Sequence, residues 1–213
     1  MNGESIFAIG SQGRCITMRI AEYSYPLLGY TLGSIPFGLV LSNLFGNKKL
    51  QESGSKNIGA TNVCRTQGKL MGFATFLFDF LKGFLPCFFL QIGSETANLL
   101  MLAAPVVGHM FSVWLKFSGG KGVATYLGVL CAASAFAGAW TLTTWLCLFY
   151  FTRISAVASI IAIIFSLFIF YWEGTALCLD FLNQLYVLMG LVVLVIVKHH
   201  ENLRRLMENM RGP

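Results

Sequence analysis

The chain has 213 residues, of which 56% are hydrophobic and only 11% are charged, and its net charge is +6. Soluble domains carry about 25% charged residues, so this composition excludes an ordinary soluble fold and indicates a helical bundle whose solvent is lipid. The basic residues lie in short segments between apolar runs, where membrane topology accounts for them without a nucleic-acid partner.

Several apolar runs along the chain have the length of a membrane-spanning helix, which needs about 20 residues. They cover residues 23–45, 70–92, 97–115, 123–151, 154–172 and 181–197. A polar loop over residues 46–69 separates the first two runs, and Glu173 with Gly174 ends the fifth. The fourth run fits one tilted helix or two shorter helices with a turn near Gly138.

The chain is therefore predicted to be an all-α, polytopic membrane bundle with about seven transmembrane helices if the fourth run splits, and five spans are the alternative. Lys and Arg gather on the cytoplasmic side of membrane proteins. An N-terminus outside and a C-terminus in the cytoplasm place most of the fifteen basic residues inside, which favours this orientation and the count of seven.

Residues 1–22 are predicted to be an N-terminal extension without the apolar stretch of a cleavable signal peptide, and Met18 is an alternative start. Residues 23–213 are predicted to form a single membrane domain. The six cysteines form no C-x-x-C pair and the three histidines show no metal-ligand spacing, so no metal and no other cofactor is expected.

The first of three polar segments lies between the first two apolar runs. Its hydrogen-bonding and basic residues are Ser55, Asn57, Thr61, Asn62 and Arg65. Small polar side chains beside positive charge suit a bound phosphate. The alternative is a solvated loop whose Ser and Asn cap a helix.

The second polar segment, residues 118–122, precedes a helix that is predicted to begin near Val123. Glycine-rich backbone at a helix N-terminus binds anions, and Lys121 adds a positive charge. The glycine spacing is not that of a Walker A loop. The alternative is a flexible loop whose lysine only marks the cytoplasmic side.

The third polar segment follows the last apolar run. His199 and Asn202 are three residues apart, and they share one helix face if the tail is helical. His199 suits the role of an acid, a base or an orienting group. The alternative is an interfacial histidine beside basic residues.

Three further polar residues lie within or beside apolar runs. Asp79 and Lys82 are one turn apart inside the second run, and we expect an ion pair within the bundle, with a proton or ion path as the alternative. His109 follows Gly108 at the predicted cytoplasmic end of the third run and is expected to border the site.

Three stretches together resemble the bacterial acyl-phosphate:glycerol-3-phosphate acyltransferase family. They read GSIPFGLVLSNLFGNKKLQESGSKNIGATNVCRTQGKLMG (residues 33–72), GHMFSVWLKFSGGKGVAT (108–125) and KHHENLRRL (198–206). The sequence FDFLKG at residues 78–83 is also similar, so the resemblance extends over nearly the whole chain, from residue 24 to 208. One departure is Lys198, where family members commonly have Arg.

The resemblance implies a multi-pass protein of the bacterial inner membrane whose motifs face the cytoplasm. It implies transfer of an acyl chain from acyl phosphate to the 1-hydroxyl of glycerol 3-phosphate, which gives lysophosphatidate in the first step of phospholipid synthesis. It also implies a functional link to the enzyme that makes acyl phosphate from acyl carrier protein. The oligomeric state is not predicted.

The resemblance also assigns roles to individual residues. Glycerol 3-phosphate would be held by Ser55, Asn57, Thr61, Asn62 and Arg65, and the donor phosphate by Gly119, Gly120, Lys121 and Gly122. The catalytic residues would be His199, Asn202 and Lys121, while Ser155, Ser159 and His109 would border the pocket.

The chemistry of an acyl phosphate fits these residue types. The donor is an activated mixed anhydride. An enzyme that holds the two anionic substrates together and offers a proton acceptor is therefore sufficient for direct attack of the hydroxyl on the acyl group. The acceptor of the proton is His199 or the substrate's own phosphate. Acyl-CoA-dependent glycerolipid acyltransferases carry a His-x-x-x-x-Asp pair, which none of the three histidines forms here. A small transporter and a structural membrane subunit are the competing functions.

Overall fold

The computed structural model describes residues 24–45, 50–90, 94–177 and 181–210. Most of these residues are helical and none of them forms a strand, which confirms the all-α prediction. The expected N-terminal extension, residues 1–22, lies outside the described part of the chain.

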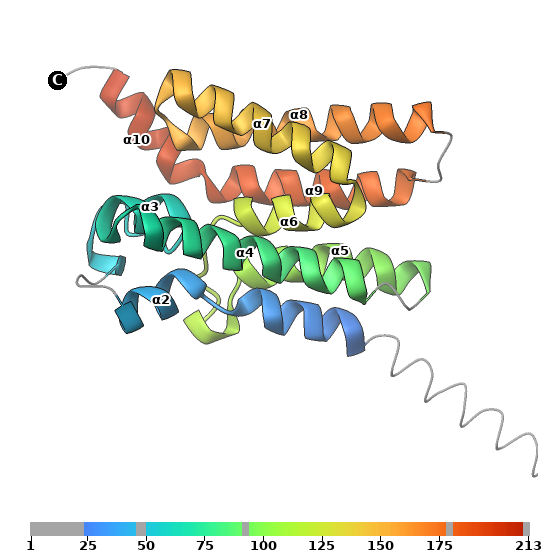
Figure 1. Ribbon diagram of the computed structural model, residues 1–213, viewed down its shortest axis with the longest axis horizontal. Coiled ribbons are helices and arrows are strands. Elements are labelled where there is room, and N and C mark those ends of the chain that lie inside the picture. Colours follow the sequence, from blue (N-terminus) through green and yellow to red (C-terminus); the bar gives the residue numbers. More distant parts are fainter. Residues whose placement is uncertain (1–23, 46–49, 91–93, 178–180, 211–213) are drawn as a thin grey trace, which may run out of the picture.

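Long helices lie side by side in the bundle, and the short helices α3 and α10 lie at the same end of it (Figure 1). The bounds of the elements that follow the first helical stretch, residues 24–34, are α2 (Phe37–Phe45), η1 (Leu50–Glu52), α3 (Ala60–Gln67), α4 (Lys69–Phe89), α5 (Glu95–Met110), η2 (Val113–Leu115), α6 (Val123–Ala133), α7 (Ala135–Thr152), α8 (Ser155–Ala176), α9 (Leu182–Lys198) and α10 (His200–Met210).

The first apolar run is a broken helix. Ile35 and Pro36 are not helical and separate residues 24–34 from α2. Proline lacks the backbone N–H that would continue the helix. The break leaves the Ile35 carbonyl inside the bundle, where Lys82 Nζ donates to it at 2.7 Å.

The fourth apolar run forms two helices, α6 and α7, so the two-helix alternative is correct but the turn is at Ser134 and not near Gly138. Ser134 Oγ accepts the N–H of Ala137 at 2.9 Å and thereby caps α7. Gly138 lies inside α7. The prediction that Glu173 and Gly174 end the fifth run is wrong, because α8 continues through both to Ala176.

In the part of the chain that the structure describes, four helical segments are long and apolar enough to cross a membrane, namely Ser24–Phe45 (counted across its break), Lys69–Phe89, Glu95–Leu115 and Ser155–Ala176. A fifth candidate joins α9 to α10 across a 44° bend. With 11 residues, α6 is about 16 Å long, roughly half of the hydrocarbon core. The exact number of spans and the orientation of the termini therefore stay predictions.

The bundle buries a core and leaves large apolar side chains outside. Tyr126, Met110 and Leu188 are fully buried, whereas Phe45 is 71% and Phe151 80% exposed. In water such exposed aromatic side chains would be costly, but lipid solvates them. The exterior therefore agrees with a bundle that is embedded in a bilayer.

Candidate active site

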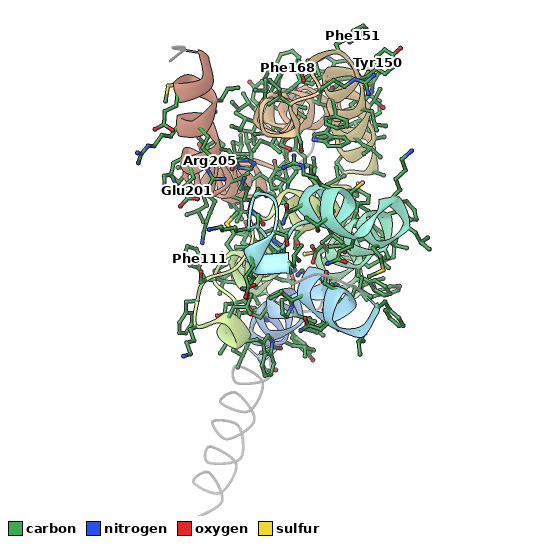
Figure 2. All side chains as sticks on the ribbon, turned by 90° about the vertical axis from the view of Figure 1, so that its left-hand side faces the viewer. Phe111, Tyr150, Phe151, Phe168, Glu201 and Arg205 are labelled. Carbon is green, nitrogen blue, oxygen red and sulfur yellow. The ribbon has the colours of Figure 1, made fainter. Side chains whose placement is uncertain are left out.

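The three polar segments meet at one end of the bundle, around α3, the loop before α6, and α10 (Figure 1). Figure 2 views this end, where Glu201 and Arg205 extend from α10 and Phe111 follows α5. The sequence prediction placed all three segments on one side of the membrane, and the fold brings them together.

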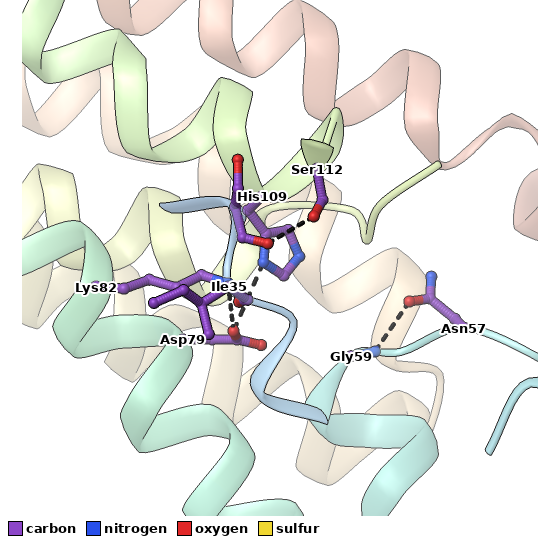
Figure 3. Close-up of polar contacts among 8 residues, drawn as sticks. Ile35, Asn57, Gly59, Asp79, Lys82, His109 and Ser112 are labelled. Atoms are coloured by element: carbon purple, nitrogen blue, oxygen red, sulfur yellow. Dashed lines mark hydrogen bonds and ion pairs between the residues drawn. The ribbon is translucent and has the colours of Figure 1, made fainter. Parts of the chain in front are cut away.

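The first segment is not wholly a loop, because it contains η1 and the two-turn helix α3. Asn57 Oδ1 accepts the Gly59 N–H at 3.0 Å in the loop just before α3 (Figure 3). The N-cap of α3 is Gly59 and no side chain caps this helix, so the alternative in which Ser and Asn cap it is wrong. We name residues 53–59 the acceptor loop. It joins η1 to α3.

The buried side chain of Asn62 organises the acceptor loop. Its Oδ1 accepts the Ser55 N–H at 2.9 Å, and its Nδ2 donates to the Asn57 carbonyl at 2.8 Å. Nδ2 also donates to the Ser53 carbonyl at 3.2 Å. Both ends of the Asn62 amide are therefore engaged with loop backbone, so this residue shapes the loop.

Thr61 and Arg65 lie on successive turns of α3, and both are exposed. Thr61 Oγ1 and Ser155 Oγ are 3.1 Å apart and share a hydrogen bond, which ties α3 to the first turn of α8. Ser155 therefore borders the acceptor segment. Hydroxyls and a guanidinium in this arrangement are suited to a phosphate.

We name residues 118–122 the donor loop. Its first glycines are bonded to the end of α5, because the Gly119 N–H donates to the Met110 carbonyl and the Gly120 N–H to the His109 carbonyl, each at 3.1 Å. These two N–H groups are thus used within the fold. The N–H groups that lack helical partners lie at the N-terminus of α6, which begins after Gly122.

Lys121 stands beside this helix N-terminus and faces α10. Burial and, to a smaller extent, the positive charge of Arg205 lower the pKa of Lys121 to about 8, while the negative charge of Glu201 opposes the shift. Two cations close together attract an anion, and the N-terminus of α6 adds a partial positive charge. The fold thus provides a cationic site between the second and third segments.

The third segment places a histidine in a defined tautomer. His199 is buried, and its Nδ1 lies 2.8 Å from the Val195 carbonyl, which only accepts hydrogen bonds. Nδ1 therefore carries the proton, and Nε2 is left as the acceptor. Lys121 is close enough to act electrostatically on this ring.

The tail is helical, which was the condition for His199 and Asn202 to share one face. The Asn202 N–H donates to the His199 carbonyl at 2.9 Å. Lys198, where the family commonly has Arg, donates to the Met110 carbonyl at 2.9 Å and lies 4.4 Å from the centre of the Phe111 ring. The third segment is thereby bonded to the Met110 carbonyl, which also accepts the Gly119 N–H.

Two predicted pocket residues lie deeper in the bundle. Ser159 is buried and its Oγ accepts the Trp145 Nε1–H at 3.0 Å, which links α7 to α8. His109 is buried directly beneath the donor loop. The predicted ion pair is confirmed, because Lys82 Nζ lies 2.7 Å from Asp79 Oδ1.

Among the residues that the structure describes, no three His, Cys, Asp or Glu side chains gather as a group that could hold a metal ion. The groups available for chemistry at this end include ammonium and guanidinium groups, hydroxyls and an imidazole nitrogen. Such a set binds anions and moves a proton.

The helical bundle and its cationic, histidine-containing end define an integral membrane protein whose polar chemistry is confined to one end. The family model for glycerol-3-phosphate acyltransferase matches residues 23–209. A glycerol-3-phosphate acyltransferase of Desulfotalea psychrophila is 43% identical over 194 residues, 87% of this chain and 94% of that protein. One from Brucella canis is 40% identical over 186 residues, 85% of this chain and 87% of that protein.

Solved structures agree with the sequence comparisons. The crystal structure of PlsY (YgiH), an integral membrane glycerol 3-phosphate acyltransferase, in its glycerol 3-phosphate form superposes with a TM-score of 0.81. The two sequences are 36% identical, with 89% of this chain and 93% of that chain covered. The lysophosphatidic acid form of the same protein superposes with a TM-score of 0.80. The chain described here belongs to the glycerol-3-phosphate acyltransferase family.

Proposed function

We propose that this protein transfers an acyl chain from acyl phosphate to the 1-hydroxyl of glycerol 3-phosphate, and that the products are lysophosphatidate and inorganic phosphate. Family membership supports acylation of glycerol 3-phosphate and favours an enzyme over a transporter or a structural subunit. The observation that carries the proposal is that Lys121, two residues before the start of α6, interacts electrostatically with Arg205 on α10 and with His199.

The choice of donor follows from the chemistry that these groups offer. Acyl phosphate and glycerol 3-phosphate are both anions, so a productive complex needs positive charge on each side. Lys121 in the donor loop and Arg65 on α3 provide it. The mixed anhydride is already activated, so the protein's contribution is to hold the two substrates in contact and to remove one proton.

The proposed step is a direct displacement. The 1-hydroxyl oxygen of glycerol 3-phosphate forms a bond to the acyl carbonyl carbon, and the bond from that carbon to the phosphate oxygen breaks. The hydroxyl proton passes to His199 Nε2, the acceptor that the Val195 hydrogen bond leaves on the ring. Phosphate leaves with the electron pair of the broken bond, and Lys121 balances its charge.

In this assignment Ser55, Asn57, Thr61 and Arg65 contact glycerol 3-phosphate, while Lys121, Gly122 and the first turn of α6 contact the donor phosphate. Asn202, one turn from His199, orients the reacting hydroxyl. Asn62, Gly119 and Gly120 act by shaping the two loops, since their polar groups bond to neighbouring backbone.

The test is turnover by the purified protein in detergent, given palmitoyl phosphate and glycerol 3-phosphate, with palmitoyl-CoA as the rival donor. We expect release of phosphate and formation of lysophosphatidate with palmitoyl phosphate, and loss of both in Lys121→Ala and His199→Ala. The exposed Lys69→Ala serves as the matched lysine control and should remain active. Turnover with palmitoyl-CoA alone would overturn the donor, and turnover with neither donor by folded protein would overturn the function.

We further propose that the protein lies in the bacterial inner membrane with the site facing the cytoplasm. Thr96 at the start of α5 and Glu208 on α10 are exposed at opposite ends of the bundle. In a cysteine-free version, Thr96→Cys should react with a membrane-impermeant maleimide in intact cells, and Glu208→Cys only after permeabilisation. The reverse pattern would invert the orientation.

A further inference from the structure

A buried ion pair on α4 lies between the end of α5 and the break in the first helix. Asp79 and Lys82 are one turn apart on α4, their side chains are 3% exposed, and Lys82 Nζ is 2.7 Å from Asp79 Oδ1 (Figure 3). Charges inside a membrane bundle are expensive and are retained where they serve a purpose. Neither residue reaches the substrate loops directly. Asp79 lies beside His109, which contacts the donor loop, and Lys82 bonds to Ile35 at the break before α2, the helix that contacts the acceptor loop.

On one side the pair connects to the donor loop through His109. The ring Nδ1 of His109 lies 3.6 Å from Asp79 Oδ1. The opposite nitrogen, Nε2, faces Gly120 so closely that a Cβ on this glycine would overlap it. The backbone carbonyl of His109 also accepts the Gly120 N–H. The imidazole is thus a spacer between Asp79 and the donor loop.

On the other side the pair connects to the acceptor loop through the broken first helix. Lys82 Nζ donates to the Ile35 carbonyl at 2.7 Å, at the break before α2. In the first turn of α2, Gly38 packs against the Ile58 carbonyl with no room for a Cβ. Ile58 lies between Asn57 and Gly59, so the position of α2 determines where the acceptor loop begins its turn into α3.

A second contact joins the two sides. Ser112 Oγ, just after α5, donates to the Ser34 carbonyl at the end of the first helical stretch at 2.6 Å (Figure 3). The end of α5, which holds the donor loop, and the helix break, which leads to the acceptor loop, are therefore held together by buried polar groups.

We propose that Asp79, Lys82 and His109 are positioning residues that set the separation of the donor loop from the acceptor loop. The inference rests on the proposed function, because it assigns the two loops to the two substrates. Acyl transfer requires the reacting atoms to approach to about 3–3.5 Å, and a misplacement of about 1 Å costs roughly 100-fold in rate. A rigid polar core below both loops meets this requirement.

The proposal predicts a division of kinetic effects between the two sides. His109→Ala removes the spacer on the donor side, so we expect the KM for acyl phosphate to rise about tenfold while the KM for glycerol 3-phosphate changes by less than about twofold. The double variant Asp79→Asn/Lys82→Met removes both charges without leaving one unpaired, and it should raise both KM values and lower kcat.

The matched control is Ser166→Ala. Ser166 Oγ shares a buried hydrogen bond with Tyr126 OH at 2.8 Å, between α8 and α6, and contacts neither loop. This variant should lower the melting temperature and leave both KM values unchanged. If His109→Ala and the double variant behave in the same way, the network is merely structural and the inference is wrong.

Hydrogen exchange provides a second readout that does not depend on turnover. In His109→Ala, the amides of Gly119 and Gly120 should exchange about tenfold faster, and those of residues 55–59 should not change. Equal exchange in wild type and variant would overturn the inference. Absence of wild-type turnover with palmitoyl phosphate would instead overturn the proposed donor, while the exchange measurement would still decide the positioning role.

Discussion

Asn62 holds Asn57 and, through it, the turn of the acceptor loop: Asn62 Nδ2 donates to the Asn57 carbonyl at 2.8 Å from a side chain that is 3% exposed. Its Oδ1 meanwhile accepts the Ser55 N–H. A buried amide that bonds at both ends cannot be exchanged for an acid without loss, because a carboxylate has no donor for the carbonyls.

Asn62→Asp should therefore raise the KM for glycerol 3-phosphate by about tenfold or more, since one lost buried hydrogen bond costs about 1–3 kcal/mol. The KM for the acyl donor should change little. Steady-state kinetics with each substrate varied in turn measures both values. The control is Asn183→Asp on α9, at the opposite end and exposed. An unchanged KM for glycerol 3-phosphate in Asn62→Asp would contradict the assigned role of the loop.

Gly120→Ala should impair use of the acyl donor, because the new methyl group overlaps His109 Nε2 and pushes the donor loop away from α5. We expect the KM for acyl phosphate to rise about tenfold, consistent with a displacement below 1 Å. Gly190→Ala on α9 is the matched control, because nothing lies within 4 Å of its added Cβ.

Steric relief tests the same contact from the other side. The double variant Gly120→Ala/His109→Ala places the methyl group where the ring was and should recover part of the affinity that Gly120→Ala loses. Additive losses in the double variant would show that the two residues act independently.

The sequence predicted the features that depend on local pattern. The apolar run at residues 70–92 corresponds closely to α4, and the spacing of Asp79 and Lys82 correctly indicated their ion pair. It missed α3, because a two-turn helix with no capping side chain in a polar segment has too little apolar periodicity to be recognised. Gly59 before Ala60 was the available signal, and it is weak.

The parts of the site that escaped prediction depend on contacts between distant segments. The glycines of the donor loop were expected to offer their amides to a phosphate, but the Gly119 and Gly120 N–H groups bond to carbonyls at the end of α5. Likewise the amide of Asn62 bonds to backbone instead of facing outward. Local spacing indicates which residues are polar, and only the packed fold shows which of their groups are already used.

The charge of Lys121 should make donor binding dependent on pH. Its pKa is lowered to about 8, so the ammonium is fully charged below about pH 7 and is lost as the pH rises through 8. The kcat/KM for acyl phosphate should therefore fall above about pH 8, approaching tenfold per unit. Lys121→Arg should remove this alkaline limb because a guanidinium stays charged, whereas Lys69→Arg should keep it. A limb that persists in Lys121→Arg belongs to another group.

The neighbouring histidines allow the proton acceptor to be tested in one experiment. His199 is buried with Nδ1 bonded to Val195, whereas His200 is exposed with Nδ1 bonded to the Val197 carbonyl at 2.9 Å. His199→Asn should lower kcat by about 10²–10⁴, the usual contribution of a general base, and leave the KM values nearly unchanged. His200→Asn should stay within about twofold of wild type.

The size of that loss decides between the two acceptors of the proton. If His199 Nε2 takes the proton, the rate of the His199→Asn variant should no longer depend on the protonation of the imidazole. Imidazole added to the buffer should then restore part of the rate. A loss of less than about tenfold, with no response to added imidazole, would assign the proton to a phosphate oxygen of the bound substrate and leave His199 as a hydrogen-bonding residue.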